Sequence, residues 1–376
     1  MLPQPPLWLI LIAFVCAIGP LVIIHELGHY WVARLFGVGA ETFSIGFGRG
    51  IAGWTDKRGT RWKIGWLPLG GYVRFVGDEN AASVPMPGDD VPPELRAKSF
   101  PHKPVWQRFL IVLAGPAANF LMAILIFAAF FATYGVPRTG NIVAAVQPGS
   151  AAARAGIRSG DRIVAVAGRS TATFEDISRT VVLRPAEQVV VVVERGEDRL
   201  RLPTRIGADE EQDRFGQRFR VGRLGVLGAQ RTYVRLPAAQ LVPAATDYTL
   251  RITGSMVDGL WQIISGRRSV KDLGGPIKIA QIAGQQATLG ALEFIQLVAL
   301  ISINLGFINL LPVPMLDGGH LLFYAVEAVR RRPLDARALD WAFRGGLALI
   351  LALLVFTTLN DLGSLGLWDR LERLIG

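Results

Sequence analysis

Two histidines and a glutamate stand together near the end of a long apolar segment, in the string IIHELGHYW (residues 23–31). His25 and His29 are four residues apart, so on a helix they project from the same face, about one turn from each other. Two ligands of a tetrahedral metal site need this spacing, and zinc binds imidazole nitrogens well. In helices with the HExxH pattern the glutamate is a general base toward water. The string therefore predicts a zinc site with His25 and His29 as ligands and Glu26 as the catalytic base.

The alternative is a chance HExxH match on a solvated helix, which short motifs always risk. Ionisable side chains are costly at bilayer depth unless they face a cavity, each other or a metal. These three residues lie at the end of a hydrophobic segment, so a metal site explains them better than chance.

A catalytic zinc site needs one more protein ligand. The string NLLPVPMLDGGH (residues 309–320) contains Asp317 and His320. Pro312 and Pro314 break the helix before them, and irregular backbone at membrane depth is tolerated only where it lines a cavity. Asp317 is therefore a candidate third ligand, and spacing alone leaves His320 as a competitor.

Two other polar residues have less specific signals. Asn309 is either a buried group satisfied by a neighbouring helix or a hydrogen-bonding group for substrate or an oxyanion. His102, in FPHKP, has no histidine or carboxylate at ligand spacing, so we interpret it as a surface residue.

The elements that carry these residues must cross a membrane. The chain has 376 residues, 51% hydrophobic and 19% charged, which is too apolar for an ordinary soluble enzyme and too charged for a pure membrane bundle. Crossing a core of about 30 Å takes about 20 helical residues. The predicted spans are Leu7 to about Leu35, Phe109–Tyr134, Phe294–Leu311, and Gly345–Leu359 with an extension back toward Trp341.

Charge sets the expected orientation. The net charge is +10, but no Lys/Arg tract is interleaved with aromatic residues, so nucleic acid is not an expected partner. Basic residues gather between the first two spans and at Arg330–Arg332, which the positive-inside rule places in the cytoplasm. Both termini and the region 135–290 are then expected on the other side. The single cysteine, Cys16, allows neither a disulfide framework nor a thiolate metal site.

The region outside the membrane begins NIVAAVQPGSAAARAGIRSGDRIVAVAGR at Asn141, which predicts a strand, a turn, a short helix and another strand. Two further strands follow, and the β-rich domain should end near Arg205. The order PGS, AAxAGI, SGDRIVAVAG is similar to a PDZ domain of the bacterial protease-associated type. A small β-barrel without a ligand is the alternative.

Taken together, the motifs resemble the site-2 protease family of intramembrane zinc metalloproteases, in its bacterial regulator-of-sigma-E protease branch. The resemblance covers nearly the whole chain, in HELGH, FSIGFG, PLGGYVRFVGDE, WQRFLIVLAGPAANF, the PDZ string, GGPIKIA, NLLPVPMLDGGH and LND near Asp361. It implies Zn²⁺ bound by His25, His29 and Asp317, and it favours Asp317 over His320. It also implies that Asn309 lies near the active site.

The resemblance further implies a membrane-associated β-loop at PLGGYVR (residues 68–74), where Gly70, Gly71, Tyr72 and Val73 are expected to offer a strand edge to the unwound substrate. This sequence has one recognisable PDZ domain where the best-known members have two, which puts in doubt any gating that needs a tandem pair. The PDZ domain is expected either to bind a peptide C-terminus or to exclude substrates with bulky outer domains.

The expected protein is thus mainly α-helical, with four transmembrane helices, a membrane-associated β-loop and a soluble β-rich PDZ domain. The expected segments are 1–136 with spans one and two, the HExxH motif and the cytoplasmic β-loop; 137–206, the PDZ domain; 207–288, a linker and amphipathic region; and 289–376 with spans three and four and the LDG motif.

The expected activity is cleavage of single-span membrane proteins within the lipid bilayer, such as an anti-sigma factor or a remnant signal peptide. The expected location is the bacterial inner membrane, with termini and PDZ domain periplasmic and the active site toward the cytoplasm. The alternative is a membrane-anchored PDZ scaffold with an inactive zinc site, although none of the four site residues has been lost.

Overall fold

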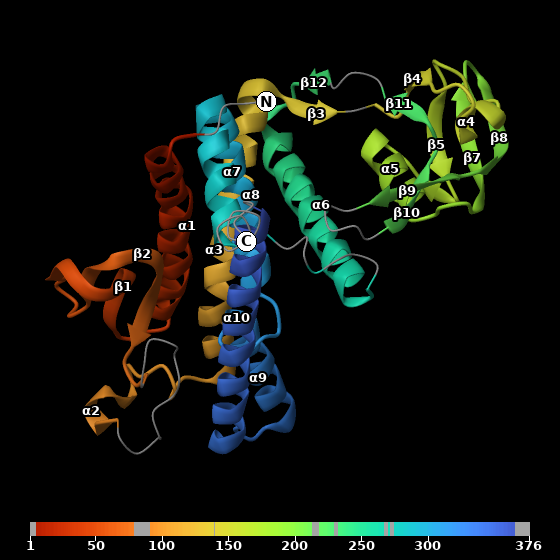
Figure 1. The fold of residues 1–376 in the computed structure, drawn as a ribbon. Helices are drawn as coiled ribbons and strands as arrows, with labels where there is room; N and C mark the ends of the chain where they lie inside the picture. The colour runs from red at the N-terminus through yellow and green to blue at the C-terminus, as the bar shows by residue number, and fades with distance from the viewer. Residues whose placement is uncertain are drawn as a thin grey trace, which may run out of the picture. The chain divides into compact units, whose positions relative to one another are not determined.

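The computed structural model describes residues 5–78, 91–138, 140–212, 218–228, 232–266, 270 and 274–364. The chain divides into two compact units. The first comprises Met1–Ala128, Ala245–Asp258 and Val270–Gly376, and the second comprises Ala129–Ala244 and Gly259–Ser269. Figure 1 shows the elements of both.

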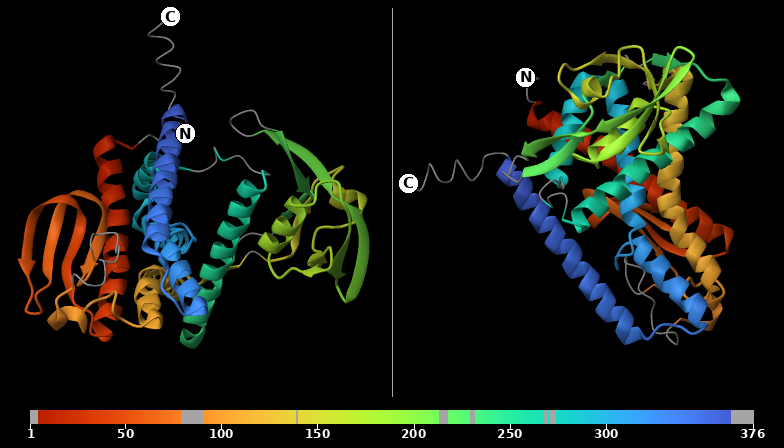
Figure 2. Two further views of the ribbon diagram at one scale, coloured as in Figure 1. Left: turned by 90° about the horizontal axis from the view of Figure 1, so that it is seen from below. Right: turned by 90° about the vertical axis from the view of Figure 1, so that its right-hand side faces the viewer.

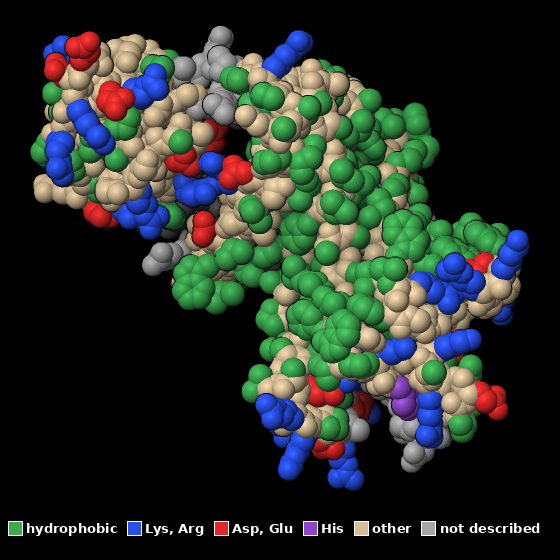
Figure 3. Space-filling model, turned by 180° about the vertical axis from the view of Figure 1, so that it is seen from behind, with side chains coloured by type: hydrophobic (Ala, Val, Ile, Leu, Met, Phe, Trp, Pro, Cys, Tyr) green, Lys and Arg blue, Asp and Glu red, His purple; other side chains and the backbone are tan. Residues whose placement is uncertain are grey.

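Long helices dominate the first unit. They are α1 (Leu7–Leu35), α3 (Val105–Tyr134), α7 (Pro276–Leu289), α8 (Ala291–Asn309), α9 (Asp317–Arg330) and α10 (Ala336–Ser364), with the short α2 (Pro93–Arg96) and part of α6 (Ala238–Ile264). Within the described residues, four helical stretches are long and apolar enough to cross a membrane: Leu7–Leu35, Val105–Tyr134, Ala291–Asn309 and Arg337–Gly363. The four predicted spans are confirmed, and the last is longer than predicted. Hydrophobic side chains gather over the surface of these helices (Figure 3).

Small residues bring the backbones of α1, α3 and α8 into contact, as is common between membrane helices. A Cβ added to Gly28 of α1 would lie 2.4 Å from the carbonyl oxygen of Ala114 on α3. A Cβ on Gly306 of α8 would lie 3.1 Å from the carbonyl oxygen of Pro116 on α3. Because neither glycine has a side chain, α3 lies directly against both neighbours.

Helix α7 is fixed at its N-terminus by a carboxylate from α10. Asp361, only 2% exposed, accepts hydrogen bonds from the backbone N–H groups of Gly275 (3.0 Å) and Lys278 (2.9 Å). Such groups have no partner within their own helix, so the carboxylate satisfies them. Further along α7, a Cβ on Gly284 would lie 2.7 Å from the Ile10 side chain of α1. The GGPIKIA string therefore begins a helix packed within the bundle.

Strands β1 (Ala40–Thr55) and β2 (Arg61–Phe75) form a bent antiparallel hairpin. Residues 42–45 of β1 pair on one side with 61–64 and on the other with 71–74 of β2. The predicted β-loop is therefore β structure, and residues 71–75 form an edge of its sheet. The views in Figure 2 show this hairpin beside α1.

The second unit contains a β module, by which we mean residues 140–228. Its strands are β4 (Val143–Val146), β5 (Arg162–Val166), β6 (Arg169–Ser170), β7 (Gln188–Arg195), β8 (Asp198–Arg205), β9 (Gly207–Gln212), β10 (Arg218–Arg223) and β11 (Val226–Gly228); its helices are α4 (Ala151–Arg154) and α5 (Phe174–Val182). In its described part, one sheet has the order β6-β5-β7-β8, and β11 pairs with β4. The same unit contains the pair β3 (Val136–Arg138) and β12 (Thr232–Val234).

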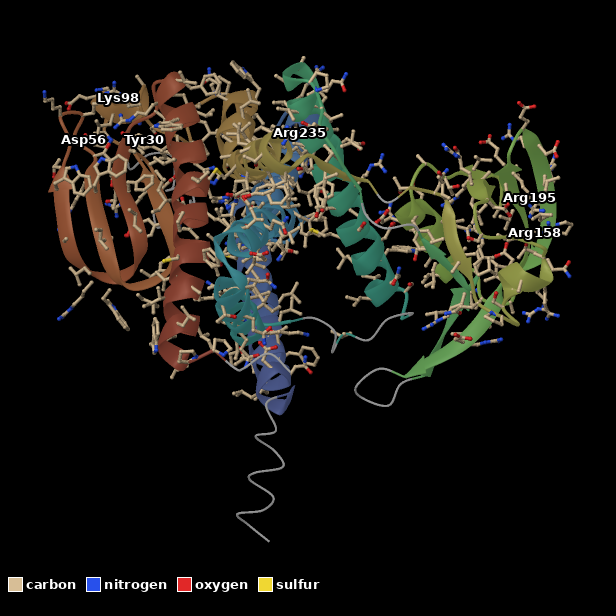
Figure 4. All side chains as sticks on the ribbon, turned by 90° about the horizontal axis from the view of Figure 1, so that it is seen from above. Tyr30, Asp56, Lys98, Arg158, Arg195 and Arg235 are labelled. Atoms are coloured by element: carbon tan, nitrogen blue, oxygen red, sulfur yellow. The ribbon has the colours of Figure 1, made fainter. Side chains whose placement is uncertain are left out.

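The core of the β module is apolar and continuous, with Ile163, Val191 and Val193 fully buried among other aliphatic residues. Helix α5 starts with a capping box, in which Thr173 and Asp176 satisfy each other's backbone N–H groups. Asp161 accepts hydrogen bonds from Arg195 and from the backbone N–H of Arg158, and the Arg195 hydrogen bond lowers the pKa of Asp161 (labelled arginines in Figure 4).

Candidate metal centre

The three predicted ligands meet inside the helical unit. His25 and His29 lie on one face of α1 and are each 8% exposed, and Asp317 is the first residue of α9. Asp317 Oδ2 lies 3.1 Å from His25 Nε2 and 3.5 Å from His29 Nε2, and the two Nε2 atoms are 3.2 Å apart. Among the described residues, these three form the cluster able to hold a metal ion.

The spacing of these donor atoms fits zinc. Four ligands at about 2.0–2.1 Å from a tetrahedral ion lie about 3.3 Å from one another, which is close to the observed separations. Asp317 Oδ2 is buried and has no hydrogen-bond partner within the described residues. Buried acceptors that face each other are costly unless a cation lies between them. The donor set therefore fits three protein ligands of a catalytic zinc site.

The hydrogen bond on the far side of the His29 ring supports the same assignment. His29 Nδ1 lies 2.9 Å from the carbonyl oxygen of Ile111, which can only accept. The proton of a neutral His29 is therefore on Nδ1, and its Nε2 lone pair faces Asp317. His25 Nδ1 lies 3.0 Å from the side-chain amide nitrogen of Asn119, which is fully buried on α3.

Asn119 and the Ile111 carbonyl were not among the predicted site residues. The available signal was the string AGPAANF, which places an asparagine within an apolar span. Polar residues at such positions usually face the bundle interior and have a function. A backbone carbonyl has no sequence signal at all, because every residue has one.

Glu26, the predicted catalytic base, is in contact with the edge of the β-hairpin. The Glu26 carboxylate accepts a hydrogen bond from the Val73 N–H, and a Cβ on Gly71 would lie 3.2 Å from Glu26 Cγ. A cavity of about 200 Å³ opens here, lined by the three ligands, Glu26, residues 71–73 and Asn309. Gly70 does not line it; at φ +90° it forms a bend against the ring of Phe47.

The other histidines lie outside the ligand cluster. His320 also lines the cavity, but its ring packs on Phe343, with centroids 5.2 Å apart. His102 is exposed, with Nδ1 3.0 Å from the Ser99 hydroxyl. The structure thus brings Asp317 rather than His320 to the two α1 histidines, and the roles of all these residues remain predictions.

A second set of contacts fixes α9, and with it Asp317. Arg108 at the start of α3 forms an ion pair with Glu327 of α9 at 2.7 Å, and its guanidinium lies over the Tyr324 ring at 4.9 Å. Both charged side chains are largely buried, so the pair has a defined geometry.

The tip of the β-hairpin is attached to α1. Asp56 accepts hydrogen bonds from Trp62 Nε1 (3.1 Å) and the Tyr30 hydroxyl (3.4 Å), and the Trp62 bond lowers the pKa of Asp56. Arg34 donates to the buried Thr60 hydroxyl nearby. Figure 4 shows Tyr30 and Asp56 side by side. The hairpin edge at Glu26 is therefore fixed to the helix that carries Glu26.

Comparisons with known proteins identify the family. The model of peptidase family M50 matches residues 13–353. A relative from Agrobacterium fabrum, provisionally named as a zinc metalloprotease, is 44% identical over 362 residues, covering 94% of this chain and 96% of its own. Metalloprotease MmpA of Caulobacter vibrioides is 39% identical over 379 residues, covering 94% and 95%.

A solved PDZ domain from Listeria monocytogenes matches 25% of this chain and 92% of its own, at 17% identity and a TM-score of 0.20. A match this distant does not establish a PDZ fold, so the PDZ interpretation depends on the sequence motif. The matches to the metalloproteases, which cover 94% of this chain, do establish a family. The chain belongs to peptidase family M50, the site-2 protease family, and is a membrane metalloprotease.

Proposed function

We propose that this protein is an intramembrane zinc endopeptidase that cuts transmembrane segments of single-span membrane proteins. The observation that carries the proposal is the buried cluster of His25, His29 and Asp317 beside Glu26, in a cavity among helices long enough to span a bilayer. A soluble protease would need no such placement, because ionisable groups at this depth are costly.

His25, His29 and Asp317 would hold the zinc ion, which supplies Lewis acidity for the scissile carbonyl and makes water acidic enough to react near neutral pH. Glu26 takes the proton of the attacking water and delivers it to the leaving nitrogen. The Val73 N–H orients the Glu26 carboxylate for this work. Asn309 offers an amide to the substrate or to the developing oxyanion.

Cleavage of a transmembrane helix requires its local unwinding, which exposes backbone groups that cannot remain unpaired in lipid. The N–H groups of Val73 and Phe75 point away from β1, to Glu26 and to Asp78 Oδ2 respectively. The direction of backbone N–H groups alternates along a strand, so the N–H of Gly71 also points away from β1. This direction supports pairing of residues 71–73 with an unwound substrate strand close to Glu26, whereas Gly70, predicted with them, lies outside the cavity.

Glu26→Gln tests the proposal, because it keeps the shape of the side chain and removes the base. Purified full-length protein in detergent is given a model single-span substrate, and bound zinc is measured in parallel. We expect the wild type to cut and the variant to hold zinc without cutting. Cleavage by the variant at the wild-type rate would remove Glu26 from the mechanism. A wild type without zinc would favour the PDZ scaffold.

For the β module we propose capture of a peptide C-terminus. A groove of about 380 Å³ runs between α5 and β11, lined by apolar residues that include Ile177, Val181 and Val226. In the described residues β11 pairs only with β4, so its other edge is free for strand addition. Binding of peptides with free and with amidated C-termini separates C-terminus capture from exclusion of bulky substrates. Capture predicts binding of the free form only, whereas size exclusion predicts equal, negligible binding of both. A trimmed anti-sigma factor or a remnant signal peptide would be the substrate class.

The proposed location is the bacterial inner membrane, with the termini and the β module periplasmic and the metal centre toward the cytoplasm. The basic residues beside the spans support this orientation. Reporter fusions at Gly207 and Arg332 should fall on opposite faces, and the same face for both would contradict it.

A further inference from the structure

We infer that Asn119 is a positioning residue for the metal centre, whose side-chain oxygen accepts the Nδ1 proton of His25 and thereby directs the His25 Nε2 lone pair at the metal. The inference rests on the proposed function, because it assumes that His25 is a ligand. It concerns which ring nitrogen of His25 has the proton, which the family assignment does not specify.

The first observation is the position of the amide. Asn119 has no exposed surface, and its side chain approaches His25 Nδ1 to 3.0 Å, on the opposite side of the ring from Asp317. An amide in this place costs free energy unless it is hydrogen-bonded, and the ring nitrogen is its neighbour. The Asn119 Oδ1 atom is buried without a hydrogen-bond partner among the described residues.

The second observation concerns which end of the amide faces the ring. Oxygen and nitrogen of an asparagine amide are nearly the same size, and a half-turn about its last bond exchanges them. A ligand His25 must have a lone pair on Nε2, so its proton must be on Nδ1, and a proton there needs an acceptor. The structure places the amide nitrogen beside Nδ1. The half-turn brings the amide oxygen there instead and so meets that need, while the amide nitrogen takes the position that Oδ1 leaves.

The third observation is that α3 serves both histidines with one face. Ile111, Gly115 and Asn119 are spaced by four residues and therefore lie along one stripe of α3. The Ile111 carbonyl accepts from His29, Gly115 leaves room for the His29 ring, and Asn119 reaches His25. The hydroxyl of Ser302 on α8 donates to the backbone carbonyl oxygen of Asn119 at 2.8 Å and holds this part of α3 in place.

The two histidines nevertheless differ. A backbone carbonyl can only accept, so it fixes the His29 tautomer without any choice of side chain. At His25 the sequence supplies the acceptor, so the tautomer there can be changed by substitution. Only the His25 half of the site is therefore open to a clean test.

The experiment measures zinc affinity of the full-length protein in detergent by competition with a chelator, so that it does not depend on turnover. Asn119→Leu has a similar shape and no acceptor; we expect its zinc affinity to fall about 10- to 100-fold, as for other partners of ligand histidines. Asn119→Asp keeps an acceptor at the same distance and should bind zinc at least as tightly as the wild type. Ser302→Ala is the matched control, because it removes a hydrogen bond from the Asn119 backbone and leaves the amide, and its zinc affinity should stay within a few-fold of wild type.

Equal zinc affinity of Asn119→Leu and the wild type would overturn the inference, and so would equal losses in Asn119→Leu and Asn119→Asp. If Asn119→Leu does not fold, the Asn119→Asp variant decides: an affinity reduced about tenfold or more contradicts the acceptor role. The absorption spectrum of the Co²⁺-loaded protein gives a second readout, since a turned His25 ring changes the ligand field while a loss of packing elsewhere does not. A wild type that binds no zinc would instead refute the proposed function.

Discussion

Replacing Gly115 with alanine should disable the metal centre by contact with a ligand. A Cβ at this position on α3 would lie 2.1 Å from His29 Nε2 and 2.4 Å from Cε1. Ordinary contact between such atoms needs about 3.5 Å, so the ring or the helix must retreat by more than about 1 Å. The ring cannot turn aside without losing the 2.9 Å hydrogen bond from Nδ1 to the Ile111 carbonyl.

A shift of that size is large for a metal site, whose ligand distances hold within about 0.2 Å. We expect Gly115→Ala to lower zinc affinity by at least about 100-fold, equivalent to about 2.8 kcal/mol. Overpacking should also reduce the free energy of unfolding by about 1–3 kcal/mol. Chelator competition and thermal unfolding of the detergent-purified protein measure the two effects.

Gly19→Ala is the matched control. It makes the same substitution within α1, where an added Cβ meets nothing within 4 Å, so zinc affinity should not change. Wild-type zinc affinity in Gly115→Ala would show that His29 does not lie against α3, and the site geometry would be refuted with it.

Two further predictions concern buried carboxylates outside the metal centre. Asp361→Ala leaves the N–H groups of Gly275 and Lys278 without their acceptor, which costs about 1–3 kcal/mol for a buried group, so hydrogen exchange across α7 should become faster. Asp361→Asn keeps an acceptor and should increase the exchange less. Unchanged exchange in both variants would contradict the anchoring role. Asp161→Asn should lower the unfolding temperature of the β module, which limited proteolysis of the full-length protein at increasing temperature measures. Because Arg195 depresses the pKa of Asp161, this stabilisation is complete above the unfolded pKa of about 3.9 and is lost as the pH falls through the folded pKa, so wild type and variant should converge in acid. A difference that persists unchanged below pH 3 would refute the ion-pair explanation.

The spans were predictable because membrane crossing depends on length and hydropathy, both local properties. The last span was predicted too short, because hydropathy identifies only the apolar centre of a helix. Helix α10 continues through polar turns on both sides, from Ala336 to Ser364. The β module was predictable for a similar reason: alternation and turn residues specify strands. Pairing across long separations is not local, and nothing in the strands beyond residue 206 indicated that Val226–Gly228 would pair with β4.

The sequence by itself determined that His25, Glu26 and His29 share one helix face, because helix periodicity fixes the direction of residues four apart. Residue spacing alone could not decide between Asp317 and His320, which lie three residues apart beyond the same proline-broken segment. The docking of α9, fixed by Arg108 and Glu327, decides which of them reaches α1. The Ile111 carbonyl and the Asn119 amide likewise become partners of the histidines only when α3 lies against α1 at Gly28. Such partnerships join residues far apart in the chain, and only the packed structure sets those distances.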